Sequence, residues 1–283
     1  MSKETSGTVA GSNEDSGLIA GRTELFSKVI AALTVLSVLV VWEILSQFAF
    51  ARLEIVFPSL LTIGEELVGL LMPGEFYYHV SITAQEVAVS FALAAVVGIV
   101  GGTLVGANEF LAKAVEPIVY YVSTVPKIVL YPLFLVALGV GMESKIALGF
   151  LSAIFPITVN TITGTLHVRE DLVKVAKVYD ASFWEVFKWV YFPSTVTHVI
   201  NGLRLGIGVA IIGVLLGELA ASQAGVGNQI GFFFSNLNTA KMYAALLLVF
   251  AVSLVLNLSL LRLQQWLWSK GYGIGDTEDS MGF

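Results

Sequence analysis

The stretch Arg169–Ala210 reads REDLVKVAKVYDASFWEVFKWVYFPSTVTHVINGLRLGIGVA and places a polar, lysine-bearing segment directly before a long apolar run. Apolar residues recur at helical spacing in Leu172–Tyr179 and again in Ser182–Val190, which predicts two short amphipathic helices. Asp180-Ala181 marks a tight elbow between them, and Pro193 is expected to end the second helix and redirect the chain. We call residues 172–190 the knob.

The second helix of the knob carries its own start signal. Ser182 and Glu185 have the spacing of a capping box, in which the hydroxyl accepts from a backbone amide and the carboxylate reaches back. Phe183, Trp184 and Phe187 supply aromatic anchors. The residues alone leave two interpretations open: a docking surface for a partner outside the bilayer, or an interfacial helix that seats the protein at the headgroups.

The composition predicts an integral membrane protein. Hydrophobic residues make up 56% of the 283 residues, charged residues 13%, and the mean hydropathy is +0.84. A soluble domain of this size needs far more charge to cover its surface. Much of the net charge of -6 lies near the two ends, so it is a poor guide to partners. The chain has no cysteine, which excludes disulfides, thiol catalysis and Cys-ligated zinc.

Six apolar runs have the length of about 20 residues that a helix needs to cross a bilayer. They are Val29–Phe50, Val87–Ala107, Ala114–Val140, Ile146–Val168, Val196–Ala221 and Met242–Leu261. Runs that are apolar on every face argue against a β-barrel, so we expect an all-α polytopic membrane protein. Lys and Arg gather on alternate connections, with only Arg52, Lys145 and Lys241 assigned to the outer ones, which predicts that both termini and the loop 169–193 are cytoplasmic.

Three segments are predicted from this topology. Residues 1–25, rich in Ser, Gly, Thr and Glu, form a disordered cytoplasmic tail; residues 26–268 form the transmembrane domain; residues 269–283 form a second cytoplasmic tail. Ala49-Phe50-Ala51 resembles a signal-peptidase site, but the preceding apolar run exceeds the usual length of about 7–15 residues, which favours a retained span. The outer segment Phe57–Tyr78 is predicted to be an amphipathic helix lying on the membrane.

Four charged residues lie in or at the edge of the spans: Glu86, Lys127, Arg204 and Glu218. Such groups are costly there and usually face the bundle interior or pair with one another. Lys127 follows Pro126, which is expected to bend the third span. Lys127 either lines the path of an anionic solute or pairs with Glu218 or Glu86. For Glu86 we favour a position at the outer water interface.

Small residues recur four apart in two spans, which predicts close helix packing. The glycines concerned are Gly98, Gly102, Gly106, Gly202, Gly206, Gly213 and Gly217. The polar side-chain groups of Tyr131, Asn160 and Thr161 either contact solute or form hydrogen bonds with neighbouring helices.

Several catalytic motifs are missing from the sequence. It contains no Gly-rich loop ending in Lys-Ser/Thr, no His-Glu-x-x-His and no Gly-x-Ser-x-Gly, and its three histidines lie in different segments. We therefore expect that this chain is not an enzyme.

The loop resembles the coupling ("EAA") loop of ABC-importer permeases. Aligned on Pro193, the Glu-Ala-Ala positions of the family pattern fall on Lys174, Val175 and Ala176, and its glycine falls on Asp180. Lys174 and Asp180 depart from that pattern, but Asp tolerates left-handed backbone better than most residues. The resemblance covers roughly residues 40–265 and is closest to the nitrate/sulfonate/taurine-type subfamily. It rests on an ordered series: Phe57-Pro58-Ser59, Val125-Pro126-Lys127, Tyr131-Pro132-Leu133-Phe134, Gly139-Val140-Gly141, Ser144-Lys145, Phe155-Pro156, Asn160-Thr161, Gly202-Leu203-Arg204-Leu205, Gly217-Glu218 and Gly225-Val226-Gly227.

This resemblance implies a type I permease architecture and a transport function in the bacterial inner membrane. It implies two permease copies, two cytoplasmic ATPase subunits that each grip one knob, and a periplasmic or lipid-anchored binding protein that docks near Phe57–Tyr78 and Ala221–Lys241. ATP and Mg would bind the ATPase, while this chain would bind no cofactor and no nucleic acid. The expected solute is a small anion such as a sulfonate, nitrate or carboxylate.

The implied site residues form two groups. The ATPase-coupling group is Lys174, Ala176, Asp180, Ala181, Ser182, Trp184, Glu185, Phe187 and Pro193. The substrate-pathway group is Lys127, Tyr131, Asn160, Thr161 and Glu218.

Two other functions compete with this one. The first is a secondary transporter that uses Glu86, Lys127 and Glu218 as a proton relay, although such folds usually contain inverted repeats that this sequence lacks. The second is a membrane scaffold without a transport role.

Overall fold

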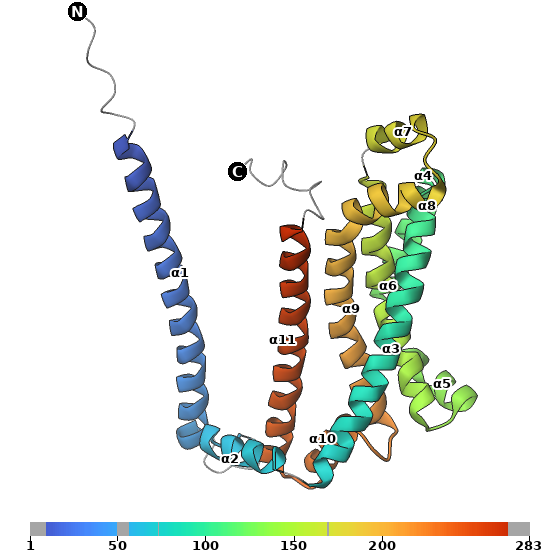
Figure 1. The fold of residues 1–283 in the computed structure, drawn as a ribbon. Helices are drawn as coiled ribbons and strands as arrows, with labels where there is room; N and C mark the ends of the chain where they lie inside the picture. Colours follow the sequence, from blue (N-terminus) through green and yellow to red (C-terminus); the bar gives the residue numbers. More distant parts are fainter. Residues whose placement is uncertain (1–9, 50–56, 73, 169, 271–283) are drawn as a thin grey trace, which may run out of the picture. The chain divides into compact units, whose positions relative to one another are not determined.

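The computed structural model describes residues 10–49, 57–72, 74–168 and 170–270, and the secondary structure of these residues is helical (Figure 1). The chain divides into two units, Met1–Glu65 and Glu66–Phe283. Most of the predicted C-terminal tail and residues 1–9 lie outside the described residues, as do Phe50 and Ala51 of the signal-peptidase alternative.

The first unit contains α1 (Ala10–Ile44), which continues as the π-helix η1 (Leu45–Ala49). Residues 10–25 are helical, where the sequence predicted a disordered tail. The apolar helix that follows gives the physical reason, because extending an existing helix avoids the costly nucleation step. After η1 the chain returns to the end of α1, where the Trp42 Nε1–H donates to the Pro58 carbonyl over 3.3 Å.

The predicted surface helix Phe57–Tyr78 is shorter in the structure. Helix α2 spans Leu60–Leu70, and a turn separates it from α3 (Glu75–Gly106), to which Tyr77 and Tyr78 belong. The sequence step Pro73-Gly74 explains the break, because both residues are poor in helix interiors.

Five helices among the described residues are long and apolar enough to span a membrane. They lie at Phe26–Gln47, Glu75–Gly106, Met142–Leu166, Trp184–Ala220 and Thr239–Ser269, and five of the six predicted spans are thereby confirmed as apolar helices of spanning length. The second, larger unit holds α3, α6 (Met142–Leu166), α9 (Phe192–Ala220), α10 (Val226–Ser235) and α11 (Thr239–Ser269). In this unit, α10 lies at the end opposite the knob (Figure 1).

The sixth predicted span, Ala114–Val140, is not one straight helix. Helix α4 (Glu109–Thr124) ends before Pro126, and the chain resumes with the 3₁₀ turn η2 (Lys127–Leu130) and α5 (Tyr131–Leu138) after a bend of 81°. Val125 is extended, with φ -68° and ψ 131°, as the steric demand of the following proline requires. The bend expected at Pro126 is therefore confirmed, and it is sharp enough to break the span.

Helices α3, α6 and α9 pack through the predicted glycine rows. A Cβ at Gly102 would lie 2.6 Å from the Thr161 Cβ, and one at Gly106 would lie 2.6 Å from the Thr165 Cβ. On α9, a Cβ at Gly206 would lie 2.7 Å from the Ile157 Cγ1. The backbones approach too closely for any larger residue, so the packing role predicted for these glycines is confirmed.

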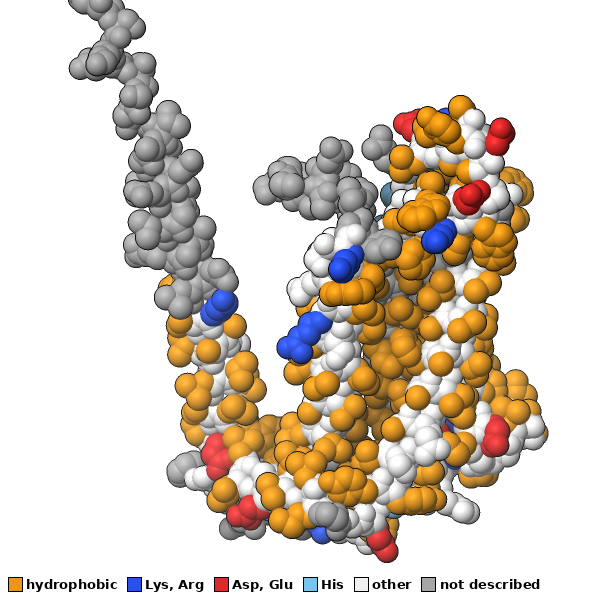
Figure 2. All heavy atoms as spheres, viewed as in Figure 1, with side chains coloured by type: hydrophobic (Ala, Val, Ile, Leu, Met, Phe, Trp, Pro, Cys, Tyr) orange, Lys and Arg blue, Asp and Glu red, His pale blue; other side chains and the backbone are white. Residues whose placement is uncertain are grey.

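Apolar side chains cover much of the visible outer faces of these helices (Figure 2). Val96 on α3 is 64% exposed and Val255 on α11 is 62% exposed. Such faces match a lipid environment, in which the hydrophobic exterior needs no polar cover.

Candidate functional site

The knob consists of two helices joined by an elbow, as predicted. Helix α7 spans Glu170–Val178, and α8 (Phe183–Val186) continues through the π-helix η3 (Phe187–Tyr191) into α9. The knob stands at the end of the bundle remote from α10 (Figure 1).

Asp180 forms the elbow in left-handed backbone conformation, with φ +52°. The Ala181 N–H donates to the Ala176 carbonyl over 3.0 Å, and the Tyr179 N–H donates to the Val175 carbonyl over 3.2 Å. The first of these is the six-residue bond of a Schellman motif, in which glycine usually occupies the position of Asp180. The elbow therefore survives the replacement of glycine by aspartate, as expected.

The capping box at the start of α8 is confirmed. The Ser182 N–H donates to the Glu185 Oε2 over 2.8 Å, and the Glu185 N–H donates to the Ser182 Oγ over 3.4 Å. The Ser182 hydroxyl also donates to the same carboxylate oxygen over 2.7 Å. These reciprocal bonds define the direction in which α8 leaves the elbow.

Pro193 does not end the second helix, so that prediction was wrong. The Phe192 N–H donates to the Phe187 carbonyl across a π-helical step, and Pro193 then occupies the first turn of α9. A proline in a first turn interrupts no bond, and the π-bulge absorbs its ring. As a result α8, η3 and α9 form one continuous helical segment from the knob into the bundle.

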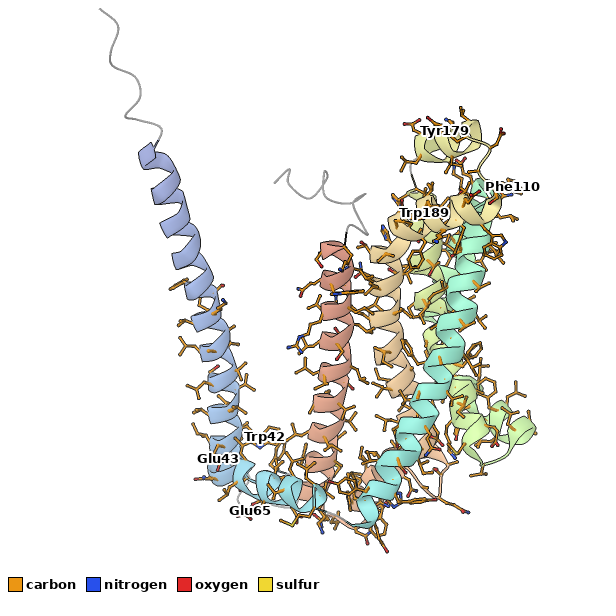
Figure 3. The ribbon with its side chains drawn as sticks, in the orientation of Figure 1. Trp42, Glu43, Glu65, Phe110, Tyr179 and Trp189 are labelled. Atoms are coloured by element: carbon orange, nitrogen blue, oxygen red, sulfur yellow. The ribbon has the colours of Figure 1, made fainter. Side chains whose placement is uncertain are left out.

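The knob exposes an apolar surface. Tyr179 is 82% exposed, Val178 81% and Trp184 73%, and the Trp184 ring meets the Phe187 ring edge to face at 6.2 Å between centroids. Figure 3 shows Tyr179 at the outermost part of the knob. Lys174 is exposed on α7 beside this surface. A partner with an apolar groove and a complementary charge would bury these side chains.

Lys127 lies at the break between α4 and η2. Its ammonium donates to the Val122 carbonyl over 2.8 Å and to the Ser123 carbonyl, and it stands 5.0 Å from the centroid of the Phe155 ring. Among the described residues it forms no ion pair with Glu86 or Glu218, so that alternative was wrong. Lys127 instead donates to two carbonyls in the last turn of α4, at the helix break.

A second polar cluster is buried nearer the α10 end of the bundle. Glu86 on α3 is 1% exposed, Glu218 on α9 is 0% exposed and Lys145 on α6 is 2% exposed. The interface position favoured for Glu86 was therefore wrong. Lys145, assigned to an outer connection from sequence, lies beside Glu218, because a Cβ at the neighbouring Gly217 would be 3.1 Å from the Lys145 Cγ. The sequence feature that could have identified Lys145 as a site residue was its place in the Ser144-Lys145 motif.

Glu218 connects this cluster to the start of α10. Its Oε1 accepts from the Thr83 hydroxyl over 2.6 Å, and its Oε2 accepts from the Gly227 N–H over 2.6 Å. Gly225, with φ +104°, packs against the carboxylate so closely that a Cβ there would lie 2.1 Å from Oε1. Both the positive φ and the close approach of the carboxylate therefore require glycine at position 225.

The remaining predicted pathway residues bond within or between helices. The Tyr131 hydroxyl donates to the Gly217 carbonyl over 2.9 Å, while Asn160 and Thr161 donate to carbonyls one turn earlier in α6, at Pro156 and Ile157. Thr161 is fully buried. The structure does not bring these side chains together with Lys127 into one site, and their contact with solute stays a prediction.

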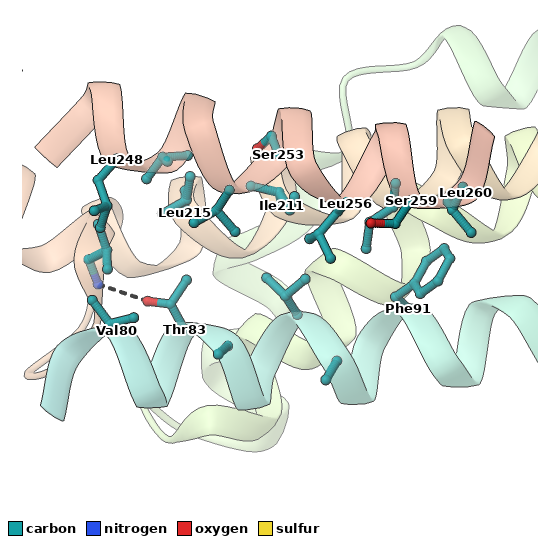
Figure 4. Close-up of a pocket in the computed structure, with 17 residues that line it drawn as sticks. Val80, Thr83, Phe91, Ile211, Leu215, Leu248, Ser253, Leu256, Ser259 and Leu260 are labelled. Carbon is teal, nitrogen blue, oxygen red and sulfur yellow. Dashed lines mark hydrogen bonds between the residues drawn. The ribbon is translucent and has the colours of Figure 1, made fainter. Parts of the chain in front are cut away.

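A cavity of about 520 Å³ lies between α3, α9 and α11 (Figure 4). Its lining is almost wholly apolar and includes Val87, Phe91, Ile211 and Leu256; none of the lining residues is charged. The hydroxyl of Thr83 at its edge accepts from the Val226 N–H over 2.8 Å. A small anion would find no electrostatic partner among these residues.

Known proteins resemble this chain in sequence and in fold. Residues 94–270 match the family described as "Binding-protein-dependent transport system inner membrane component". The chain is 29% identical to the aliphatic sulfonates transport permease protein SsuC of Bacillus subtilis (strain 168) over 226 residues, covering 80% of this chain and 81% of that protein. It is 30% identical to the nitrate import permease protein NrtB of Synechocystis sp. over 235 residues, covering 80% and 84%. The fold matches the MetNI methionine ABC transporter in inward-facing conformations with a TM-score of 0.57 and 19% identity, covering 66% of this chain and 93% of that chain.

Proposed function

We propose that this chain, which belongs to the binding-protein-dependent transport system inner membrane component family, forms the translocation pathway of an ABC importer for a small anionic solute. As a family member it is a multi-pass subunit of the inner membrane and a transport permease. The solute, the copy number and the orientation of the termini belong to the proposal.

One observation carries the mechanism: the knob exposes an apolar, aromatic surface and is continuous with a spanning helix. Because α8, η3 and α9 follow one another without a break in helical structure, a displacement of the knob is passed directly to α9. We infer that two ATPase subunits each hold one knob on the cytoplasmic side. ATP and Mg bind those subunits, and their closure tilts α9 in each of two permease copies.

The coupling residues divide by what they do in this mechanism. Asp180, Ala181, Ser182 and Glu185 shape the elbow and the start of α8, whereas Trp184 and Lys174 present exposed groups to the partner. A lysine at position 174 calls for an acidic residue in the groove of the ATPase. Charge reversal by Lys174→Glu should therefore weaken coupling, and an ATPase carrying the opposite reversal should restore it.

An anionic solute is supported by two observations. The names of SsuC and NrtB specify sulfonates and nitrate, and Lys127 places a half-buried cation at the broken α4–α5 segment. The ammonium has carbonyl partners but no carboxylate partner among the described residues, so its charge is not neutralised there. A binding protein is expected to deliver the solute at the α10 end, near residues 57–78 and 221–241.

Reconstitution tests the function. Liposomes holding this chain with its ATPase and binding protein should take up solute only with ATP and Mg, and Lys127→Gln should lower uptake of the anion more than it lowers ATPase binding. Sulfonate, nitrate and bicarbonate should be compared side by side. Uptake driven by a proton gradient without any ATPase would instead establish the secondary transporter.

A further inference from the structure

The buried cluster of Glu86, Glu218 and Lys145 contains two acids and one base. The three side chains come from α3, α9 and α6, and each is at most 2% exposed. Thr83, three residues before Glu86 on α3, bonds to Glu218, and a Cβ at Gly217, beside Glu218, would lie 3.1 Å from the Lys145 Cγ. With both cluster glutamates ionised, the buried group would carry a net negative charge, and an uncompensated buried charge is costly.

Hydrogen bonds distinguish the two acids. Glu218 has a donor on each oxygen, from the Thr83 hydroxyl and from the Gly227 N–H, which favours its ionised form. Glu86 Oε2 is buried and has no hydrogen-bond partner in the part of the chain that the structure describes. The Lys145 ammonium donates to the Val140 and Gly141 carbonyls over 2.6 and 3.0 Å rather than to Glu86. A carboxylate at position 86 would therefore hold negative charge on an Oε2 that no donor reaches among the described residues.

We propose that this cluster binds one proton, on Glu86, and that the bound proton allows the ionised Glu218 to hold the start of α10. The neutral Glu86 leaves Glu218 and Lys145 as a balanced pair. Loss of the proton would place a second negative charge beside Glu218 and weaken its bonds to Thr83 and Gly227. The attachment of α10, to which His79 also contributes by accepting from the Gly225 N–H over 3.1 Å, then weakens when Glu86 loses its proton.

The sign of the pH effect follows from linkage. When a rising pH removes the proposed proton from Glu86, the buried cluster gains its second negative charge and the bonds from Glu218 to the start of α10 weaken. Glutamine at position 86 is neutral at every pH, so the Glu86→Gln chain should keep α10 attached as the pH rises.

The test compares wild type with Glu86→Gln and Glu218→Gln. Infrared difference spectra of the purified chain at neutral pH should show a protonated carboxyl band that disappears in Glu86→Gln and remains in Glu218→Gln. Amide hydrogen exchange should measure the attachment of Val226 and Gly227. After correction for intrinsic rates, their exchange in wild type should rise about tenfold or more at alkaline pH, which corresponds to about 1.4 kcal/mol, but should stay level in Glu86→Gln.

Three results would overturn the proposal. One is a spectrum without a band assigned to Glu86, and another is the same alkaline rise in exchange in Glu86→Gln. Failure of Glu86→Gln to fold would also contradict it, because a neutral isostere should replace a neutral carboxyl. These readouts need no transport, so they stand apart from the proposed function.

Discussion

Two regions differ in what restricts the choice of residue at each position. One is the seam where α3, α6 and α9 pack together, and the other is the knob. At the seam, backbone approach leaves no room for a Cβ at Gly98, Gly102 or Gly106. In the knob, Val178 and Tyr179 are more than four-fifths exposed, and local hydrogen bonds define the shape. The seam is limited by packing against its own chain, whereas the knob exposes the side chains that we propose contact another.

Substitutions should therefore separate stability from coupling. A change at the seam should destabilise the chain whatever partner is present. A change on the exposed surface of the knob should leave the fold intact and weaken attachment of the ATPase.

The largest effect is expected at the seam, for Gly102→Leu. Its Cβ alone would lie 2.6 Å from the Thr161 Cβ and 3.0 Å from the Thr158 carbonyl oxygen, so α3 and α6 must separate. Overpacking of this kind costs about 3 kcal/mol or more, measured as lowered thermal stability in detergent. Gly101→Leu on the same helix is the control, because a Cβ at Gly101 meets nothing within 4 Å. Equal melting temperatures for the two variants would contradict the packing role.

Trp184→Ala tests the exposed surface of the knob. Removal of an exposed aromatic anchor should weaken ATPase binding by about 2 kcal/mol, roughly 30-fold in Kd, without lowering thermal stability. Tyr78→Ala removes an aromatic that is 59% exposed near the α10 end and should leave ATPase affinity unchanged. A drop in thermal stability with unaltered affinity would assign Trp184 to the fold instead.

A smaller effect is expected at the elbow. Asp180→Ala should destabilise the knob by about 1 kcal/mol, because a β-carbon without a polar side chain is disfavoured at positive φ, while Asp180→Gly should stabilise it. Hydrogen exchange of the Ala181 amide, which donates to the Ala176 carbonyl, measures both changes. If both variants shift exchange in the same direction, left-handed strain is not what limits this position.

The smallest effect is expected for Ser182→Ala, which removes the hydroxyl partner of the Glu185 amide. Loss of a serine N-cap costs about 1 kcal/mol or less and should appear as faster exchange of amides in the first turn of α8. Ser182→Thr keeps a capping hydroxyl and serves as the control. Uniform exchange across all three chains would show that the π-helical continuation, and not the cap, holds α8.

Local signals in the sequence predicted much of this fold. Hydropathy located five helices of spanning length, the Ser182–Glu185 spacing predicted the capping box, and the glycine rows predicted the seam. The elbow at Asp180 followed from the backbone tolerance of aspartate. Each of these features depends on residues within a few turns of one another or on a repeated pattern.

Predictions failed where distant segments decide the outcome. Pro193 was expected to end a helix, but a π-bulge carries the helix through it. Glu86 was placed at a water interface, and Lys145 in an outer connection, because their partners lie far along the chain. No local sequence pattern predicts that α3, α6 and α9 bury their charged residues together.

The sequence by itself determined that this chain is a helical membrane protein with an exposed two-helix knob, because hydropathy, caps and turn residues act over a few residues. Only the tertiary structure decided which charges meet. Glu218 reaches Thr83, 135 positions away, because packed helices bring distant residues together, and burial then makes each unmatched charge costly.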